Sequence, residues 1–211
     1  MGQEIDKAEF NSADFERFQR RLTSEMALLR ELFSNNTFSS SHPVGGSEVE
    51  AWLVDESNRP APVNQEFISR LSNPLVVHEL SRFNVELNSM PHELTGGVLR
   101  VMHKEMSDLW QSCIETAATL NTRLAMIGTL PVLDDSLLTM ANMSEVERYR
   151  GLNEQVLNLR QGMPITLDIR GRDHLQSSHQ DVMLEAAATS FQIHLQVRPE
   201  NAVRYYNASV L

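Results

Sequence analysis

The stretch Val44-Gly-Gly-Ser-Glu-Val-Glu-Ala-Trp-Leu-Val54 alternates apolar and polar residues in its second half. Successive side chains of a β-strand point to opposite faces, so a period of two predicts a strand whose faces differ in chemistry. One face would carry Glu48 and Glu50, and the other would carry Val49 and Ala51. The stretch therefore predicts a strand that packs one face against a core and presents carboxylates on the other.

Two further stretches show the same alternation, Phe83-Asn-Val-Glu-Leu-Asn88 and Ser190-Phe-Gln-Ile-His-Leu-Gln-Val197. Their polar faces carry an acid, two amides and an imidazole: Glu86, Asn88, Gln192 and His194. If the three strands share a sheet, one face holds these groups without a Lys or Arg among them. Like charges on neighbouring strands repel one another, so a cation would stabilise such a face. The pattern predicts a site for a divalent metal and a nucleotide.

The predicted ligand types limit which metal ion the site would bind. Carboxylate and amide oxygens with few imidazoles and no thiols favour a hard ion, Mg²⁺ or Mn²⁺, over zinc. A second interpretation stays open at this point, because antiparallel sheets often expose one polar face to water. In that case the acidic row is simply a solvated surface.

Composition limits the partners and the compartment. The chain has 211 residues, 41% of them hydrophobic, and a formal net charge of −10. This charge argues against nucleic acid and anionic membranes as partners, since either would require a basic face. Cys113 is the only cysteine, so no intrachain disulfide can form. An acidic N-terminus without an apolar core is no secretory signal, and we expect a cytoplasmic protein.

The remaining segments predict a mixture of helices and strands. Apolar residues recur at helical spacing from Phe15 to Phe33, with Ser12 as an available N-cap, and a polar run follows. We therefore expect residues 1–43 to be an N-terminal amphipathic helix and linker, separate from residues 44–211. Within the second part, the patterns predict helices over 65–71, from 97 onward, over 145–159 and from Pro199, and strands over 74–88, 124–130 and 165–169.

From about residue 44 to the end, the sequence resembles the glutamate–cysteine ligase family, in particular its bacterial carboxylate–amine ligase branch. Five motifs in the family's order carry the resemblance: Gly46-Ser-Glu-Val-Glu-Ala-Trp-Leu-Val-Asp55, Glu79-Leu-Ser-Arg-Phe-Asn-Val-Glu-Leu-Asn88, Gly128-Thr-Leu-Pro131, Arg148-Tyr-Arg-Gly-Leu152 and Thr189-Ser-Phe-Gln-Ile-His-Leu-Gln196. The chain departs from many relatives at Leu130, where they carry a His in the third motif.

The resemblance implies an α+β, glutamine-synthetase-like fold. In such a fold a curved, mainly antiparallel sheet holds ATP and divalent metals on its concave face, and helices pack on its outer face. It also implies an ATP-dependent ligase that phosphorylates the γ-carboxylate of glutamate. An amine acceptor, best known as cysteine in this family, then attacks the γ-glutamyl phosphate. The expected cofactor is Mg²⁺ or Mn²⁺, with ATP as a substrate.

The family's site residues carry over by position. The four acids of the first two motifs match metal ligands: Glu48, Glu50, Glu79 and Glu86. A second set matches positions that contact nucleotide or substrate: Asn88, Arg148, Arg150, Gln192 and His194. Phosphoryl transfer concentrates negative charge, which bound metal ions neutralise.

The family's catalytic domain continues beyond the position that matches Leu211, and the last predicted helix lacks the usual C-terminal signals. We therefore expect the N-terminal part of a ligase domain, with a sheet that is incomplete at its C-terminus. An alternative is a non-catalytic binding or interaction module that keeps the acidic sheet face. Further sequence past residue 211 would separate these two interpretations.

Overall fold

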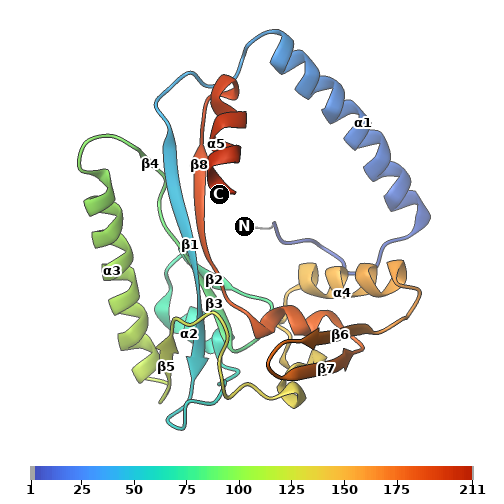
Figure 1. The fold of residues 1–211 in the computed structure, drawn as a ribbon, viewed down its shortest axis with the longest axis vertical. Helices are drawn as coiled ribbons and strands as arrows, with labels where there is room; N and C mark the ends of the chain where they lie inside the picture. The colour runs from blue at the N-terminus through green and yellow to red at the C-terminus, as the bar shows by residue number, and fades with distance from the viewer. Residues whose placement is uncertain (1–2, 211) are drawn as a thin grey trace.

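The structure is a computed structural model that describes residues 3–210. Its centre is β1 (Val44–Val54), which pairs with β3 (Asn84–Asn88) on one side and with β8 (Phe191–Gln196) and β5 (Arg123–Ala125) on the other (Figure 1). Two short strands, β2 (Val76–His78) and β4 (His92–Glu93), complete the six-stranded sheet beside β3 and the start of β1. All of these pairings are antiparallel. The expected α+β class with an antiparallel sheet is confirmed, and the sheet is open rather than closed.

One face of the sheet packs against two helices. The inward side chains of β1 and β3 meet α2 (Asn64–Leu71) and α3 (Val98–Ala118), which lie along this face. The core that results consists of apolar residues from the sheet and both helices: Val49, Ala51, Leu53, Phe67, Val76, Val85, Leu87, Leu109, Cys113 and Ala117. Burial of these side chains supplies the main hydrophobic stabilisation of this layer. Cys113, a free thiol, is buried in this core.

A second core covers the lower end of the opposite face. Trp52 follows Glu50 on the same face of β1, and its ring stacks on Phe83 with centroids 5.6 Å apart. The Trp52 indole also donates a hydrogen bond to the carbonyl oxygen of Ile127 at 2.9 Å. The segment from Leu130 to Ala187 packs over this pair and contains α4 (Glu147–Leu159) and three 3₁₀ turns, Asp135–Leu137, Met140–Asn142 and Val182–Ala187. This second core closes one end of the acidic face.

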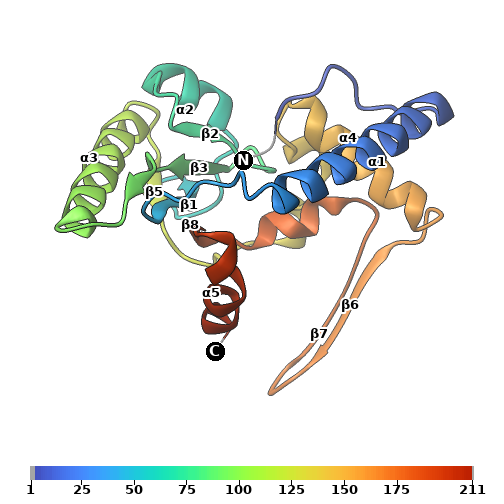
Figure 2. The same ribbon diagram turned by 90° about the horizontal axis from the view of Figure 1, so that it is seen from above.

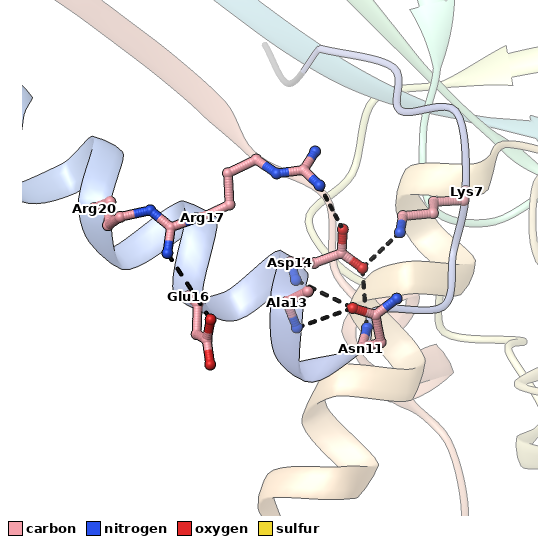
Figure 3. A network of polar contacts seen from close by, with 7 residues as sticks. All are labelled: Lys7, Asn11, Ala13, Asp14, Glu16, Arg17 and Arg20. Carbon is pink, nitrogen blue, oxygen red and sulfur yellow. Dashed lines mark hydrogen bonds and ion pairs between the residues drawn. The ribbon is translucent and has the colours of Figure 1, made fainter.

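The first helix, α1 (Ser12–Ser34), stands away from the sheet (Figures 1 and 2). Asn11 caps it: the Asn11 side chain accepts hydrogen bonds from the amides of Ala13 and Asp14, and Asp14 accepts one from the Asn11 amide (Figure 3). This capping box replaces the predicted cap at Ser12, because the helix begins one residue earlier than the apolar pattern indicated. No residue of α1 is buried.

The N-terminal arm that leads into α1 lies on α4. Gly151 in α4 is buried, and a Cβ at this position would come within 3.2 Å of the Ile5 side chain and 3.4 Å of the Phe10 ring. Glycine therefore permits the close approach of the arm to the helix. Lys7 adds an ion pair to Asp14 at 2.5 Å, which ties the arm to the first turn of α1 (Figure 3).

Two C-terminal segments project from the body. The strands β6 (Ile165–Arg170) and β7 (His174–His179) form a separate two-stranded hairpin that extends away from the sheet in Figure 2. After β8, a 3₁₀ turn (Pro199–Asn201) leads into α5 (Ala202–Ser209), which has no buried residue. Within residues 3–210, no helix is both long enough and apolar enough to cross a bilayer.

Two details differ from the sequence-based expectations. The strand predicted over 124–130 ends at Ala125, and Met126 and Ile127 are exposed. This prediction was wrong because the apolar run leaves the sheet, and Leu130 joins the second core instead. The extended stretch over 74–88 is divided into β2 and β3 by a turn.

The apolar side of β8 is uncovered. Its register places Phe191 beside Val49 on the helix-facing side of the sheet, but Phe191, Ile193 and Leu195 are 64%, 69% and 47% exposed. The helices α2 and α3 cover β1 and β3 and do not reach this strand. The division of the chain at residue 44 into two parts stays a prediction.

Replacing Trp52 with Ala should lower the free energy of unfolding by about 3–5 kcal/mol, because it opens a cavity in the second core and removes the indole hydrogen bond. Urea denaturation followed by circular dichroism measures the change. Leu159→Ala is the control, because Leu159 is 84% exposed and its truncation should change stability by less than about 0.5 kcal/mol. Equal effects of the two substitutions would contradict the second core.

Candidate functional site

The strand pairing assembles the acidic face, which we define as Glu48, Glu50, Glu86, Asn88, Gln192 and His194. In the β1–β3 register Glu50 is paired with Glu86 and Glu48 with Asn88. In the β1–β8 register Glu48 is paired with Gln192, and Gly46 with His194. Paired residues project their side chains to the same face. The predicted common face of the three strands is therefore confirmed.

Neutral donors and one imidazole surround the carboxylates of this face. Glu50 accepts hydrogen bonds from the amide and the hydroxyl of Ser190 at 2.9 and 2.6 Å. Glu86 accepts one from the Asn88 side-chain amide at 2.7 Å. The His194 Nε2 atom lies 3.3 Å from a carboxylate oxygen of Glu48. Sequence reasoning missed Ser190, which stands just before β8 and orients Glu50 from the end of the neighbouring strand.

The carboxylates are buried more deeply than a solvated surface would require. Glu48 and Glu86 are 8% and 7% exposed. A buried carboxylate is costly unless hydrogen bonds or opposite charges compensate it. The strands β1, β3 and β8 contain no Lys or Arg, and the amides, the hydroxyl and His194 contribute to this compensation. A bound cation would relieve the remaining repulsion, which favours a binding face over a solvated one.

Glu79 lies in the turn after β2 and faces the same acids. Burial, together with the negative charges of Glu50 and Glu86, raises the pKa of Glu79 to about 7, although a hydrogen bond from the Leu80 amide and the charge of Arg148 act in the opposite direction. The Leu80 amide donates to a carboxylate oxygen of Glu79 at 2.9 Å. The structure thus brings the fourth predicted acid to the face, from a loop rather than a strand.

The first turn of α4 supplies the cation nearest to Glu79. The Arg148 guanidinium donates to the Tyr149 hydroxyl at 2.9 Å and to the His78 carbonyl oxygen at 3.3 Å. The Tyr149 hydroxyl also donates to the His78 carbonyl oxygen at 3.0 Å. Burial raises the pKa of the Tyr149 hydroxyl, so this group stays protonated. Together these bonds fix α4 beside the strand end that carries Glu79.

Two hollows lie along the acidic face. The first has a volume of about 320 Å³ and is lined by residues of β1, β3, α4 and the segment before β8, among them Glu50, Glu79, Asn84, Tyr149 and Glu185. The second has a volume of about 220 Å³ and is lined at the start of β1 by Gly46, Glu48, Asn88 and His194, among others. The two hollows therefore lie at different parts of the acidic face, and predicted site residues line each of them.

Asn84 borders the first hollow and is 1% exposed. Its side-chain oxygen accepts a hydrogen bond from the Ser81 hydroxyl, whereas its side-chain nitrogen has no acceptor among residues 3–210. A buried donor without a partner is uncommon in folded proteins.

Arg150 lies elsewhere. It is exposed, forms an ion pair with Glu147 at 3.1 Å, and borders a pocket between α4 and residues 6–9 of the N-terminal arm. The structure therefore brings eight of the nine predicted site residues to the acidic face or its margin and leaves Arg150 outside. The helical period explains the separation, because Arg148 and Arg150 are two residues apart and project about 200° from each other around the helix.

The carboxylate and amide oxygens of the acidic face are suitable ligands for a hard cation, but they do not converge on one point. Carboxylate and amide oxygens are the ligands that Mg²⁺ prefers. Among residues 3–210, however, no group of three His, Cys, Asp or Glu side chains is close enough together to hold a metal ion. Mg²⁺ commonly uses one or two carboxylates and completes its shell with water and substrate phosphates. The face fits that mode of binding better than a closed protein cage.

Comparison with protein families supplies the identification. The model of the glutamate-cysteine ligase family 2 (GCS2) matches residues 44–209, which include all strands of the acidic face. The chain belongs to this family. Membership in GCS2 implies the carboxylate–amine ligase superfamily. No match was found among curated proteins or among solved structures.

The raised pKa of Glu79 predicts a pH-dependent effect on the stability of this GCS2 protein. Below pH 4.5 the carboxyl is protonated in both the folded and the unfolded chain, so it has no effect. Between pH 4.5 and about 7 the unfolded chain releases its proton first, and stability falls. In Glu79→Gln this loss is absent, and the variant should gain up to about 3 kcal/mol over the wild type above pH 7.

Urea denaturation of both chains at pH 4.5, 6 and 8 in metal-free buffer measures this gain. The matched control is Glu56→Gln, a substitution in an exposed turn, whose stability should follow that of the wild type at each pH. A constant difference between Glu79→Gln and the wild type across the range would contradict the buried, crowded environment of Glu79.

Proposed function

We propose that the protein is an ATP-dependent carboxylate–amine ligase with glutamate–cysteine ligase-like chemistry. The observation that carries the proposal is the row formed by Glu48 and Glu50 on β1 and Glu86 on the paired strand β3, within the segment that matches the family. These strands supply oxygen ligands and no basic side chain. Such a face suits a metal–nucleotide complex, because the metal ions neutralise both the protein carboxylates and the phosphates.

We assign metal binding to Glu48, Glu50, Glu79 and Glu86, and nucleotide or substrate contacts to Asn88, Arg148, Gln192 and His194. Bound Mg²⁺ or Mn²⁺ would neutralise phosphate charge during transfer. Glu50 is held by two hydrogen bonds from Ser190, so its orientation is fixed before a ligand arrives. The charge of Arg148 acts on Glu79, and we assign to Arg148 a contact with a substrate carboxylate or a phosphate. For Arg150 the same role is proposed only from the family motif.

The proposed reaction has two steps. The γ-carboxylate of glutamate attacks the terminal phosphorus of ATP, which forms γ-glutamyl phosphate and releases ADP. An amine, with cysteine as the leading candidate, then attacks the acyl carbon, loses a proton and displaces inorganic phosphate. The site must exclude water between the two steps, because water would hydrolyse the acyl phosphate.

Three finer features belong to the same proposal: a glutamine-synthetase-like curvature of the sheet, a cytoplasmic location, and a catalytic domain of which this chain is the N-terminal part. The antiparallel sheet with helices on one face supports the first feature. The lone, buried cysteine supports the second. The uncovered apolar side of β8 supports the third.

A non-catalytic binding module is the second candidate. The specific observation in its favour is that no three metal-ligating side chains of residues 3–210 converge. Such a module would bind a metal–nucleotide complex on the acidic face without activating glutamate. Binding and turnover must therefore be measured separately.

The test uses the full 211-residue chain with Mg²⁺, ATP, glutamate and hydroxylamine, which traps γ-glutamyl phosphate as a hydroxamate. Glu50→Gln keeps an acceptor for the Ser190 hydrogen bonds but removes the charge. It should weaken Mg²⁺–ATP binding in calorimetry by about tenfold or more and abolish hydroxamate formation, with the melting temperature nearly unchanged. The matched control is Glu66→Gln, because Glu66 lies on α2 and pairs with Arg70 away from the face.

The possible outcomes distinguish the ligase from the binding module. Hydroxamate formation that depends on Mg²⁺ and Glu50 supports the ligase. Binding that depends on Glu50 without hydroxamate supports the binding module, unless a longer chain that continues past residue 211 forms the hydroxamate, which supports the ligase with this chain as its N-terminal part. The absence of any Mg²⁺–ATP binding to the wild-type chain would leave the acidic face as a solvated surface and would refute both.

A further inference from the structure

The helix α1 lies outside the segment that matches the family and presents an apolar surface. Six large apolar residues on it are between 38% and 63% exposed: Phe15, Phe18, Leu22, Met26, Leu29 and Phe33. The helix is anchored at its start by the capping box and the Lys7–Asp14 ion pair (Figure 3), and the rest of it stands clear of the sheet (Figure 1). It is therefore an ordered helix whose apolar side is not covered within residues 3–210.

These six residues form one straight stripe, which we call the α1 stripe. The spacings between them are 3, 4, 4, 3 and 4 residues, which average to the 3.6-residue period of an α-helix. All six consequently fall on one side of the helix over about five turns. A stripe of this width is typical of a helix that packs along another helix.

The charges of α1 are balanced, unlike those of the whole chain. Four acids and four arginines lie between Ser12 and Ser34, whereas the chain carries a net charge of −10. Two copies of the chain repel one another in general, but two copies of α1 do not. Charge repulsion therefore does not oppose a contact through α1.

The charged residues beside the stripe are arranged for pairing with themselves. Arg21 and Glu25 lie one turn apart on the same flank of the α1 stripe. The midpoint of this pair is residue 23, and the midpoint of the stripe from Phe15 to Phe33 is residue 24. A two-fold axis near these positions makes the same flanks of two antiparallel helices meet. Arg21 of each copy then faces Glu25 of the other.

A parallel pair of α1 helices does not bring Arg21 of one copy opposite Glu25 of the other. In a parallel arrangement opposite flanks meet, so Glu25 of one copy would come near Arg30 of the other, whereas Arg21 would face the uncharged Gln19. Only the antiparallel arrangement pairs both Arg21 and Glu25 with opposite charges while it joins the stripes.

We propose that α1 is a self-association element: two copies of this chain pair through antiparallel α1 helices, with the α1 stripe as the apolar seam and Arg21 and Glu25 as reciprocal partners. This inference does not depend on the proposed ligase activity, because α1 lies outside the acidic face. It also leaves the acidic face of each copy on its own sheet.

A charge-reversal series tests the pairing in the full chain. Multi-angle light scattering and sedimentation velocity should show a concentration-dependent dimer for the wild type. Arg21→Glu alone and Glu25→Arg alone each place like charges opposite one another and should raise the dissociation constant by about tenfold. The double variant with both substitutions should restore the wild-type value. An equimolar mixture of the two single variants should form a heterodimer, because its charges are complementary.

The α1 stripe is tested by Leu22→Gln with Met26→Gln, which should abolish the dimer. Neither side chain is buried, so circular dichroism and the melting temperature should stay unchanged. The control is Ala27→Gln on the opposite side of the helix, which should leave the dimer intact.

Engineered cysteines distinguish the two directions. In the antiparallel pair Phe18 of one copy lies near Leu29 of the other, whereas the two Phe18 residues are about 16 Å apart along the axis. A mixture of Phe18→Cys and Leu29→Cys chains should therefore form a mixed disulfide under mild oxidation, and Phe18→Cys alone should not. The native Cys113 is fully buried, so the wild type is the background control.

Several results would overturn the proposal. These are a wild-type chain that stays monomeric, a dimer that survives the Leu22→Gln and Met26→Gln substitutions, a charge swap that fails to restore association, or Phe18→Cys cross-linking with itself. A monomeric wild type would assign the stripe to a different partner. A surviving dimer would assign association to another surface, such as β8 or α5.

Discussion

The antiparallel pairing of β1 with β3 and β8 fixes which side chains share each face of the sheet. Because the register sets Glu50 opposite Glu86 and Glu48 opposite Asn88 and Gln192, carboxylates are collected on one face and apolar residues on the other. A shift of one residue in either pairing would send the acids into the layer of α2 and α3. The hydrophobic core under those helices therefore holds the acidic face in place, since the acids cannot be rearranged without exposing the core.

The second core covers one end of the acidic face and positions the side chains of α4 beside it. Trp52 ends the acidic row on β1, and its contact with Phe83 brings the segment from Leu130 to Ala187 over the lower sheet. That segment carries α4, which places Arg148 and Tyr149 against the carbonyl of His78. Glu79 follows directly and is buried among acids, which accounts for its raised pKa. The packing of the second core thus produces the charge environment of Glu79, on which the proposed chemistry depends.

Two apolar surfaces, the apolar side of β8 and the α1 stripe, are left uncovered by this packing. The apolar side of β8 lies beyond the reach of α2 and α3, and no residue of the α1 stripe belongs to either core. Exposed apolar area of this kind marks a place of association. For α1, the balanced and self-complementary charges specify a second copy, whereas β8 offers no comparable charge pattern.

The sequence by itself determined β1, β3 and β8, their faces and the family resemblance, because period-two alternation and short motifs are local properties of the chain. It predicted the bounds of β1 correctly and placed Glu48, Glu50 and Glu86 on one face. It could not predict the end of β5 at Ala125 or the hydrogen bonds from Ser190 to Glu50. Those features depend on contacts between residues far apart in the chain. Only the tertiary structure decided that Glu79 is buried beside other acids, because the crowding of charges requires β1, β3 and α4 to be packed together.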